Sequence, residues 1–446
     1  MKKLSKISLA QLYKNDMAAR KMNMLRGGNN CGCGYYRSLY MKRIIIYIFF
    51  INSLIMFGCT DKVSKFDKNT EILLSYNVNM VDEKEYILCL SDLMESIEVI
   101  KLDNSTEEAF GRIWDIAISD NYIATANVGE SVKLYNRKNG KFIGNIGRRG
   151  QGPGEYTNVW GITFNEADNR VYIWPNMKNY IYSYDINGNF IEKETIHLPD
   201  GIASRGTMFL NKQTNEMIVF ITPYGSYQRR NTNFAEEKYI CWTQDLQGNI
   251  KESISASNYI IPRNSSYSWA SHTNHKSSIY SYALRTTNSN IRKDTLYHYN
   301  SKNNQLYPVY TTNFPHEENI VICSLESPLH YYTIHATYKK GYITNPENLE
   351  GCKILQVDKS THKGRYIRMV NDYLGDIEIV LYDFLCSVKN DYSSIIYNPL
   401  DLKEQLEEAL ETNTNMSDEV RNRVLTMKNS LNENDNDILV ICKFKQ

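Results

Sequence analysis

The chain has 446 residues and a formal net charge of +1, with 42% hydrophobic and 23% charged residues. This composition provides enough apolar surface for a packed core and excludes a largely disordered chain. The 34 tyrosines stand out, and tyrosine suits half-buried strands in which the ring packs and the hydroxyl reaches water.

The first segment, residues 1–40, carries eight basic residues and one acidic residue. A normal export signal opens only afterwards, at Met41, with M-K-R-I-I-I. We therefore expect residues 1–40 to result from a start codon assigned too far upstream, or to be an unstructured extension, rather than to form a domain.

Residues 41–59 have the order of a secretory signal. Lys42 and Arg43 precede the uncharged run Ile44–Phe57, which at 14 residues is shorter than the roughly 20 that a transmembrane helix needs. Gly58-Cys59 resembles a lipobox, in which Cys59 is lipidated and becomes the mature N-terminus. An uncleaved N-terminal anchor is the alternative.

After the signal, we expect residues 60–94 to be a tether and lead-in. Residues 1–58 hold 10 of the 51 basic and one of the 50 acidic residues, so the remainder has a net charge of −8. This charge predicts no nucleic-acid partner. The later cysteines are scattered through apolar runs, which favours buried free thiols over a disulfide framework.

Residues 95–446 alternate short apolar runs with turns rich in Asn, Asp and Gly, a pattern typical of antiparallel strands. The stretch that begins at Trp114 can be laid over the one at Trp160, and looser copies follow. Each copy holds four strands in about 45–50 residues, the size of one propeller blade. The repeat predicts an all-β, six-bladed β-propeller of four-stranded antiparallel blades.

The end of the chain departs from this alternation. Leucines and valines at helical spacing predict a short helical insertion at about 400–432, and Ser417 is an N-cap candidate. The apolar run 438–444 predicts a strand that pairs with an early strand near Ile97–Leu102 and closes the ring.

Residues 145–156 read N-I-G-R-R-G-Q-G-P-G-E-Y. Gly154 is followed by Glu155 rather than by Lys and Ser or Thr, which excludes a P-loop. The glycines and Pro153 favour a connector between two blades. A weaker hypothesis is an anion contact made by Arg148 or Arg149.

The G-x-x-G-x-G-P-G-E-Y run, the lipobox and the C-terminal strand together resemble a family of six-bladed β-propeller lipoproteins common in Bacteroidetes and related to NHL-repeat propellers. The resemblance covers most of residues 70–446. It implies an exported, membrane-tethered propeller, and it implies neither an established activity nor catalytic residues.

Aromatic side chains are the other candidate contacts for a ligand. Trp114 and Trp160 occupy matching repeat positions, which indicates packing, whereas Trp269 lies in a polar stretch and is the best candidate for stacking on a ligand. The sequence predicts no catalytic residue, no metal site and no cofactor.

We therefore expect a lipid-anchored propeller of the cell envelope, an outer-membrane lipoprotein that acts as a non-enzymatic binding or interaction module. Its expected partners are the membrane, through the anchor, and an unidentified ligand or protein on one face, such as a glycan or peptide. The alternative is a lyase or hydrolase of the NHL or lactonase kind with a metal in the central channel.

Overall fold

The structure is a computed structural model that describes residues 73–104, 113–127, 129–176, 178–200, 206–229, 232–234, 236–261, 269–275, 279–285, 295–314, 320–338 and 349–446. The expected N-terminal extension, the signal and Cys59 lie outside these residues. Within them, no helix has the length and hydropathy needed to cross a membrane.

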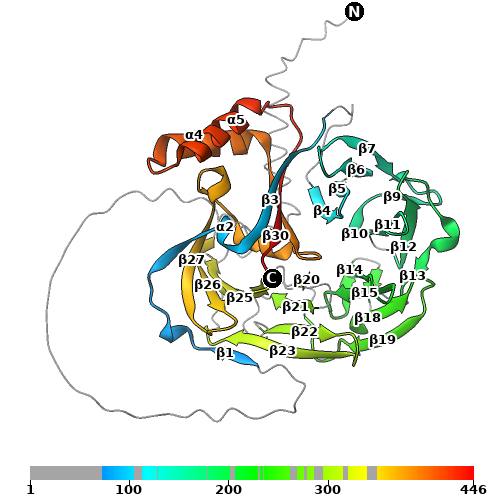
Figure 1. Cartoon of the computed structure of the whole chain (residues 1–446). Coiled ribbons are helices and arrows are strands. Elements are labelled where there is room, and N and C mark those ends of the chain that lie inside the picture. Colours follow the sequence, from blue (N-terminus) through cyan, green and yellow to red (C-terminus); the bar gives the residue numbers. More distant parts are fainter. Residues whose placement is uncertain are drawn as a thin grey trace, which may run out of the picture.

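Six antiparallel sheets are arranged in a ring, which confirms the predicted six-bladed propeller (Figure 1). The first strands of blades 1 to 4 contact one another in turn around the centre. Blades 1 to 3 comprise β4 (Ile113–Ile118), β5 (Tyr122–Asn127), β6 (Val132–Asn136) and β7 (Phe142–Ile146); β10 (Val159–Asn165), β11 (Arg170–Pro175), β12 (Tyr180–Asp185) and β13 (Ile196–His197); and β14 (Gly206–Asn211), β15 (Glu216–Ile221), β18 (Tyr239–Asp245) and β19 (Ile250–Ser255).

Blades 4 to 6 complete the ring and depart from the four-stranded pattern. They comprise β20 (Trp269–His275), β21 (Ile279–Arg285), β22 (Leu296–Asn300) and β23 (Gln305–Thr312); β24 (Ile320–Glu326), β25 (His330–Tyr338), β26 (Leu349–Asp358) and β27 (Gly364–Asn371), with the short β28 (Ile377–Glu378); and β29 (Tyr392–Tyr397), β30 (Ile438–Phe444) and β3 (Met94–Lys101). The complete sheet of blade 4 has five strands, that of blade 5 has six, and that of blade 6 has three.

The core is divided into six hydrophobic clusters, one at each interface between neighbouring blades. Strand β30 packs against a neighbouring blade on each of its two faces, which explains why its sequence is almost entirely apolar. Leu439 and Ile441 pack toward blade 1, whereas Val440 and Cys442 pack toward blade 5. A strand that is covered on both faces is nearly continuously hydrophobic.

The two ends of the chain close the ring. Strand β3 pairs antiparallel with β30, with Val99 opposite Val440, as the sequence predicts. Upstream, β1 (Leu74–Tyr76) adds parallel to β23, and β2 (Glu85–Cys89) adds parallel to β27. Residues 74–101, here called the N-terminal clasp, therefore hold three consecutive blades, and strands begin well before residue 95.

Two helices lie between β29 and β30, which confirms the predicted insertion. Helix α4 (Pro399–Thr412) begins at Asn398, whose side chain accepts from the N–H groups of Leu400 and Asp401. Helix α5 (Asp418–Ser430) begins at Ser417, the predicted N-cap. The buried faces of both helices join the cluster between blades 5 and 6.

Blade 6 contributes a helix instead of a strand to the centre of the ring. Helix α3 (Leu381–Cys386) contacts β20, β24 and β29, and it buries Leu385 completely. The segment that follows, residues 387–391, has no strand conformation and reaches the innermost strands of other blades. On the blade 6 side, the centre of the ring is therefore lined by a helix and a loop instead of by a strand.

The prediction of buried free thiols holds for three cysteines, holds in part for Cys89, which is free but half-buried, and is wrong for Cys352. Cys89, Cys241, Cys323 and Cys442 are free, and the last three are buried. Cys352 is disulfide-bonded. The spacing of scattered cysteines along a sequence does not reveal which of them the fold brings together. The disulfide bond of Cys352 was therefore not expected.

Candidate functional site

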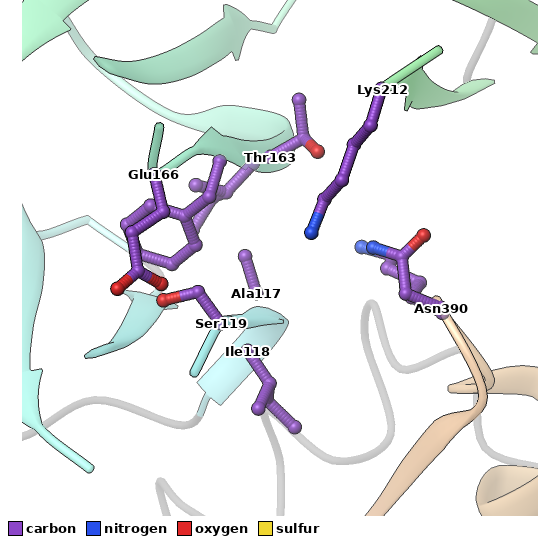
Figure 2. A pocket seen from close by; sticks show the side chains of 10 residues that line it. Ala117, Ile118, Ser119, Thr163, Glu166, Lys212 and Asn390 are labelled. Atoms are coloured by element: carbon purple, nitrogen blue, oxygen red, sulfur yellow. The ribbon is translucent and has the colours of Figure 1, made fainter. Parts of the chain in front are cut away.

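A small cavity opens at the centre of the ring, where the innermost strands of blades 1 to 3 end (Figure 2). Ser119, Glu166 and Lys212 each follow directly after one of these strands, and Lys389 and Asn390 come from blade 6. The cavity volume is about 20 Å³, enough for a water molecule or one small polar group of a ligand.

Lys389 is held by an ion pair across blades. Its Nζ lies 2.6 Å from Asp115 Oδ1 on β4, and the two side chains are 19% and 17% exposed. The other carboxylate oxygen of Asp115 accepts from the N–H of Ile162 on β10 at 2.9 Å. Asp115 thereby joins blades 1, 2 and 6 and neutralises the charge of Lys389.

Asn390 is fixed by a reciprocal amide pair with the buried Asn274 of blade 4. The Nδ2 of Asn274 donates to Asn390 Oδ1 at 3.0 Å, and the N–H of Asn390 donates to Asn274 Oδ1 at 2.9 Å. Asn390 has a φ of 53°, a left-handed conformation that asparagine tolerates better than most residues. The blade 6 side of the cavity is therefore rigidly placed.

Glu166 provides a negative charge at the rim. Its carboxylate accepts from the N–H groups of Asp120 and Asn121 and from the side-chain amide of Asn121. Burial raises the pKa of Glu166, but these donors outweigh burial, and the pKa lies below its usual value. Glu166 is therefore ionised at neutral pH.

Lys212 provides the charge that is open to a ligand. It is exposed on the turn between β14 and β15, and its ammonium points toward the cavity (Figure 2). Within the described part of the chain, no carboxylate lies within ion-pair distance of it. The cavity thus presents a cation and an anion on opposite sides, with polar groups between them.

The predicted contacts Arg148 and Arg149 lie elsewhere, in the connector between blades 1 and 2. They form β8 (Arg148–Arg149), which pairs with β9 (Glu155–Tyr156). Arg148 is 80% exposed and donates to Glu155 at 2.6 Å, and the backbone N–H of Arg149 donates to Ser131. The anion contact stays a prediction, since an anion would compete with Glu155 for Arg148.

The third predicted contact, Trp269, is the first residue of β20, and its side chain lies outside the described residues. Of the other tryptophans, Trp174 and Trp242 are buried at 1% and 0% exposure. Trp114 and Trp160 are half-buried.

Glu155 and Tyr156 give the connector its shape. Gly152 N–H donates to Glu155 at 2.9 Å, and this bond together with the Arg148 guanidinium lowers the pKa of Glu155. Tyr156 donates to the carbonyl of Ile146 and accepts from the N–H of Val132. These contacts support the interpretation of the glycine-rich run as a blade-to-blade connector.

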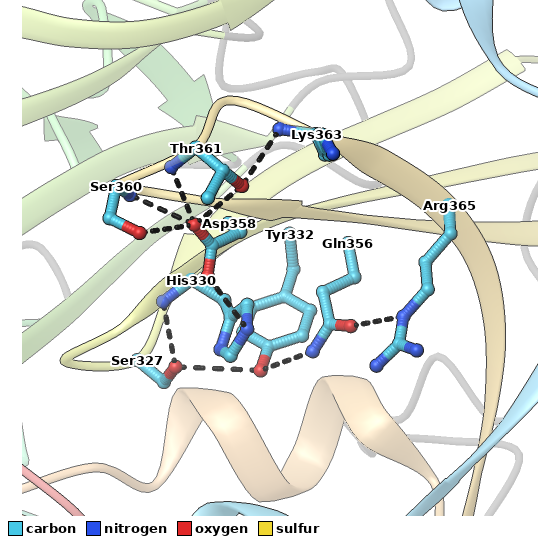
Figure 3. A network of polar contacts seen from close by, with 9 residues as sticks. All are labelled: Ser327, His330, Tyr332, Gln356, Asp358, Ser360, Thr361, Lys363 and Arg365. Atoms are coloured by element: carbon cyan, nitrogen blue, oxygen red, sulfur yellow. Dashed lines mark hydrogen bonds and ion pairs between the residues drawn. The ribbon is translucent and has the colours of Figure 1, made fainter.

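A second polar cluster lies on two turns of blade 5 (Figure 3). Asp358 accepts from the backbone and hydroxyl groups of Ser360 and Thr361, and His330 Nε2 lies 3.7 Å from the Asp358 carboxylate. Burial lowers the pKa of His330. The hydrogen bonds of Asp358 run within its turn, and Gln356 bonds to Tyr332 and Arg365 on the neighbouring strands, so this network stabilises blade 5.

Between blades 4 and 5, a Ser, a His and a Glu come together without forming a nucleophilic site. His298 Nε2 lies 2.7 Å from Glu326, which also contacts Lys359. Ser281 donates to Glu326 rather than to the imidazole, and Ser281, His298 and Glu326 are at most 4% exposed. A nucleophile needs a base within hydrogen-bond reach and access for substrate, so this cluster is structural.

Among the residues that the structure describes, no group of three or more His, Cys, Asp or Glu residues is arranged to hold a metal ion.

The fold and the cavity define a six-bladed propeller with a charged, polar pocket at the centre of its ring. Residues 73–443 match the model of a family described as a domain of unknown function, DUF4934, and the chain belongs to that family. No curated protein sequence matches the chain significantly.

Two solved structures resemble the chain at low sequence identity. A "putative exported protein" from Bacteroides fragilis is 15% identical with a TM-score of 0.50, over 84% of this chain and 100% of that one. A duf4221 family member from Bacteroides vulgatus is 12% identical with a TM-score of 0.41, over 79% and 97%. At such identities the first likeness shows the fold alone.

Sequence reasoning missed the pocket residues Lys212, Glu166, Lys389 and Asn390. Each is one polar residue in a turn, and turns are rich in such residues throughout the chain. These four residues lie near one another only because three different blades meet at the centre. For Glu166 and Lys212, the only signal was a position directly after an apolar strand, and Lys389 and Asn390, in the loop between α3 and β29, had no such signal.

The connector geometry predicts a large effect of Gly154→Ala. Gly154 has a φ of 69°, and an added Cβ would lie 2.4 Å from the Phe190 ring. We expect a loss of about 1–3 kcal/mol in the free energy of unfolding, measured by urea denaturation.

Gly144→Ala is the matched control, because the added Cβ meets nothing within 4 Å and Gly144 does not have a positive φ. Equal stability of the two variants would contradict the assigned packing of the connector.

Proposed function

We propose that this protein is an exported, lipid-anchored binding module of the cell envelope, and that it holds a ligand at the central pocket through Lys212. The observation that carries the binding proposal is the pocket itself. Four blades place its groups, Glu166 and Lys389 already have partners, and Lys212 is left open toward the cavity.

The pocket chemistry favours a ligand with a carboxylate next to hydroxyl or amide groups. The carboxylate would bind the Lys212 ammonium and the Asn390 amide, and a hydroxyl donor would face Glu166. Because the cavity is only about 20 Å³, one group of the ligand would enter it and the rest would lie over the surface. Acidic saccharides and acidic peptides both present such groups.

Several features support export and anchoring. Residues 41–59 have the order of a lipoprotein signal, ending at Cys59. Disulfide bonds such as that of Cys352 are typical of oxidising compartments outside the cytosol. The Bacteroides fragilis protein with the same fold is described as exported. A relation to NHL-repeat propellers is part of the same proposal.

Replacement of the lipobox cysteine tests the anchor. We expect Cys59→Ala to move the protein from the membrane fraction to the soluble fraction, or to block its processing, because the thiol that carries the lipid is gone. Fractionation and immunoblotting of a Gram-negative host measure this.

Cys89→Ala is the control, since Cys89 is free and lies in the clasp. A Cys59→Ala protein that is processed and retained in membranes like the control would overturn the lipoprotein proposal.

Lys212→Ala tests the pocket. With galacturonate as the probe and calorimetry as the measurement, we expect about tenfold weaker binding, about 1.4 kcal/mol, because a charge-assisted hydrogen bond is lost.

Lys302→Ala serves as the control, because Lys302 is an exposed lysine on another strand-end turn outside the pocket. Absence of galacturonate binding to the native chain, or equal binding by both variants, would contradict the assignment of Lys212.

A further inference from the structure

The N-terminal clasp carries the most exposed large apolar side chains in the described part of the chain. Met80 is 79% exposed and Ile87 is 61% exposed. Leu73, directly before the clasp, and Tyr86 are 43% and 36% exposed. Single exposed apolar residues are common on protein surfaces, but a group of four in one short segment is a candidate interaction surface.

Met80 and Ile87 both lie at the outer rim of the interface between blades 4 and 5. Met80 ends the 3₁₀ turn η1 (Val78–Met80), and Val78 packs against the cluster between these blades. On β2, Leu88 joins the cluster between blades 5 and 6, so the preceding Ile87 points to the blade 4 side. Figure 1 shows the clasp on the outside of the two blades. We call Leu73, Met80, Tyr86 and Ile87 the rim patch.

Basic side chains flank the aromatic member of the rim patch. The Lys84 ammonium lies 5.1 Å from the centroid of the Tyr86 ring, and the Arg365 guanidinium lies 5.9 Å from it. Tyrosine beside Lys or Arg is typical of the zone between lipid tails and water, where the ring lies at the level of the headgroups and the long cations reach the phosphates. The chemistry of the rim patch therefore fits a phospholipid surface.

The charge around the rim patch is balanced. The chain after residue 58 has a net charge of −8, which opposes its approach to phosphate groups. Beside the patch, however, Glu83 lies 3.8 Å from Lys353, and Glu85 lies 3.8 Å from Arg368. These basic residues of blade 5 offset the acidic residues of the clasp, so this side of the molecule can approach a zwitterionic bilayer.

The lipid anchor proposed at Cys59 brings the rim patch to a bilayer. Residues 60–72 separate Cys59 from Leu73, and even a fully extended chain of this length spans only about 50 Å. A tether converts a weak contact into an intramolecular one at high effective concentration. A patch too small to hold a soluble protein on a membrane is therefore sufficient to orient an anchored one.

We infer that the rim patch docks on the membrane, with its apolar side chains in the headgroup region of the bilayer. The inference rests on the proposed lipid anchor and adds the part of the fold that contacts the lipid. Because the patch lies on the outer rim of the ring, docking would set the propeller on its edge. The central pocket would then stay open to the side instead of facing the membrane.

The first test holds the chain on a membrane without relying on Cys59. Residues 60–446, which contain every strand and helix that the structure describes, carry an N-terminal hexahistidine tag and bind to phosphatidylcholine vesicles that contain a nickel-chelating lipid. Oxidation of Met80 by hydrogen peroxide is followed by mass spectrometry on vesicles and in solution. We expect the vesicles to slow oxidation of Met80 about tenfold. The half-buried Met427 on α5 is the internal control and should react equally in both states.

The second test asks whether Met80 and Ile87 act together. Ile87→Thr keeps a β-branched residue on the strand and removes apolar surface, so we expect the protection of Met80 by vesicles to fall to about twofold. Ile143→Thr is the matched control, because Ile143 is 48% exposed on the outermost strand of blade 1. It should leave the protection unchanged. The thermal midpoint of each variant shows whether it is folded.

These outcomes separate the rim patch from the lipid anchor. Equal oxidation of Met80 on vesicles and in solution, or protection that a folded Ile87→Thr variant retains in full, overturns the patch and leaves the anchor standing. Protection of Met80 in solution that rises with protein concentration would also overturn it, since a second copy of the chain would then cover the patch. Membrane retention of the Cys59→Ala protein would count only against the anchor.

Discussion

The pairing of β3 with β30 is the interaction on which the rest of the structure depends. Each of the six hydrophobic clusters lies between two blades, so a ring with one interface open would expose apolar faces on both sides of the gap. The two strands close that gap with residues from opposite ends of the chain. The clasp extends the closure to blades 4 and 5 through β1 and β2.

The pocket is a product of this closure. Asp115 belongs to the first blade after the closing strand and Lys389 to the blade that the strand completes, so their ion pair spans the closing interface. Blade 6 lacks an innermost strand, which leaves space for α3 and for the loop with Lys389 and Asn390. The irregular blade thus supplies groups that a regular strand would not place there.

The elements that have strong local sequence patterns could be predicted from the sequence. The Trp114 and Trp160 repeats predicted the blades, helical spacing and Ser417 predicted the insertion, and the apolar run 438–444 predicted the closing strand. The strands β1 and β2 were missed because they are short and add to edges formed far away in the chain.

The candidate site was less predictable for two physical reasons. From the sequence, Arg148 was a candidate to bind an anion. In the structure, Arg148 donates a hydrogen bond to Glu155, seven residues later in the same connector. Pocket residues such as Lys212 could not be recognised from the sequence, because the residues that surround them belong to other blades.

Hydrogen exchange measured by mass spectrometry on the full chain tests the closure most directly. If β3 closes the ring, the amides of residues 94–101 and 438–444 will exchange together and among the slowest of the molecule, because neither strand can open without the other. Fast exchange of residues 94–101 with continued protection of residues 438–444 would contradict the account, since it would show that the ring is held without its N-terminal strand.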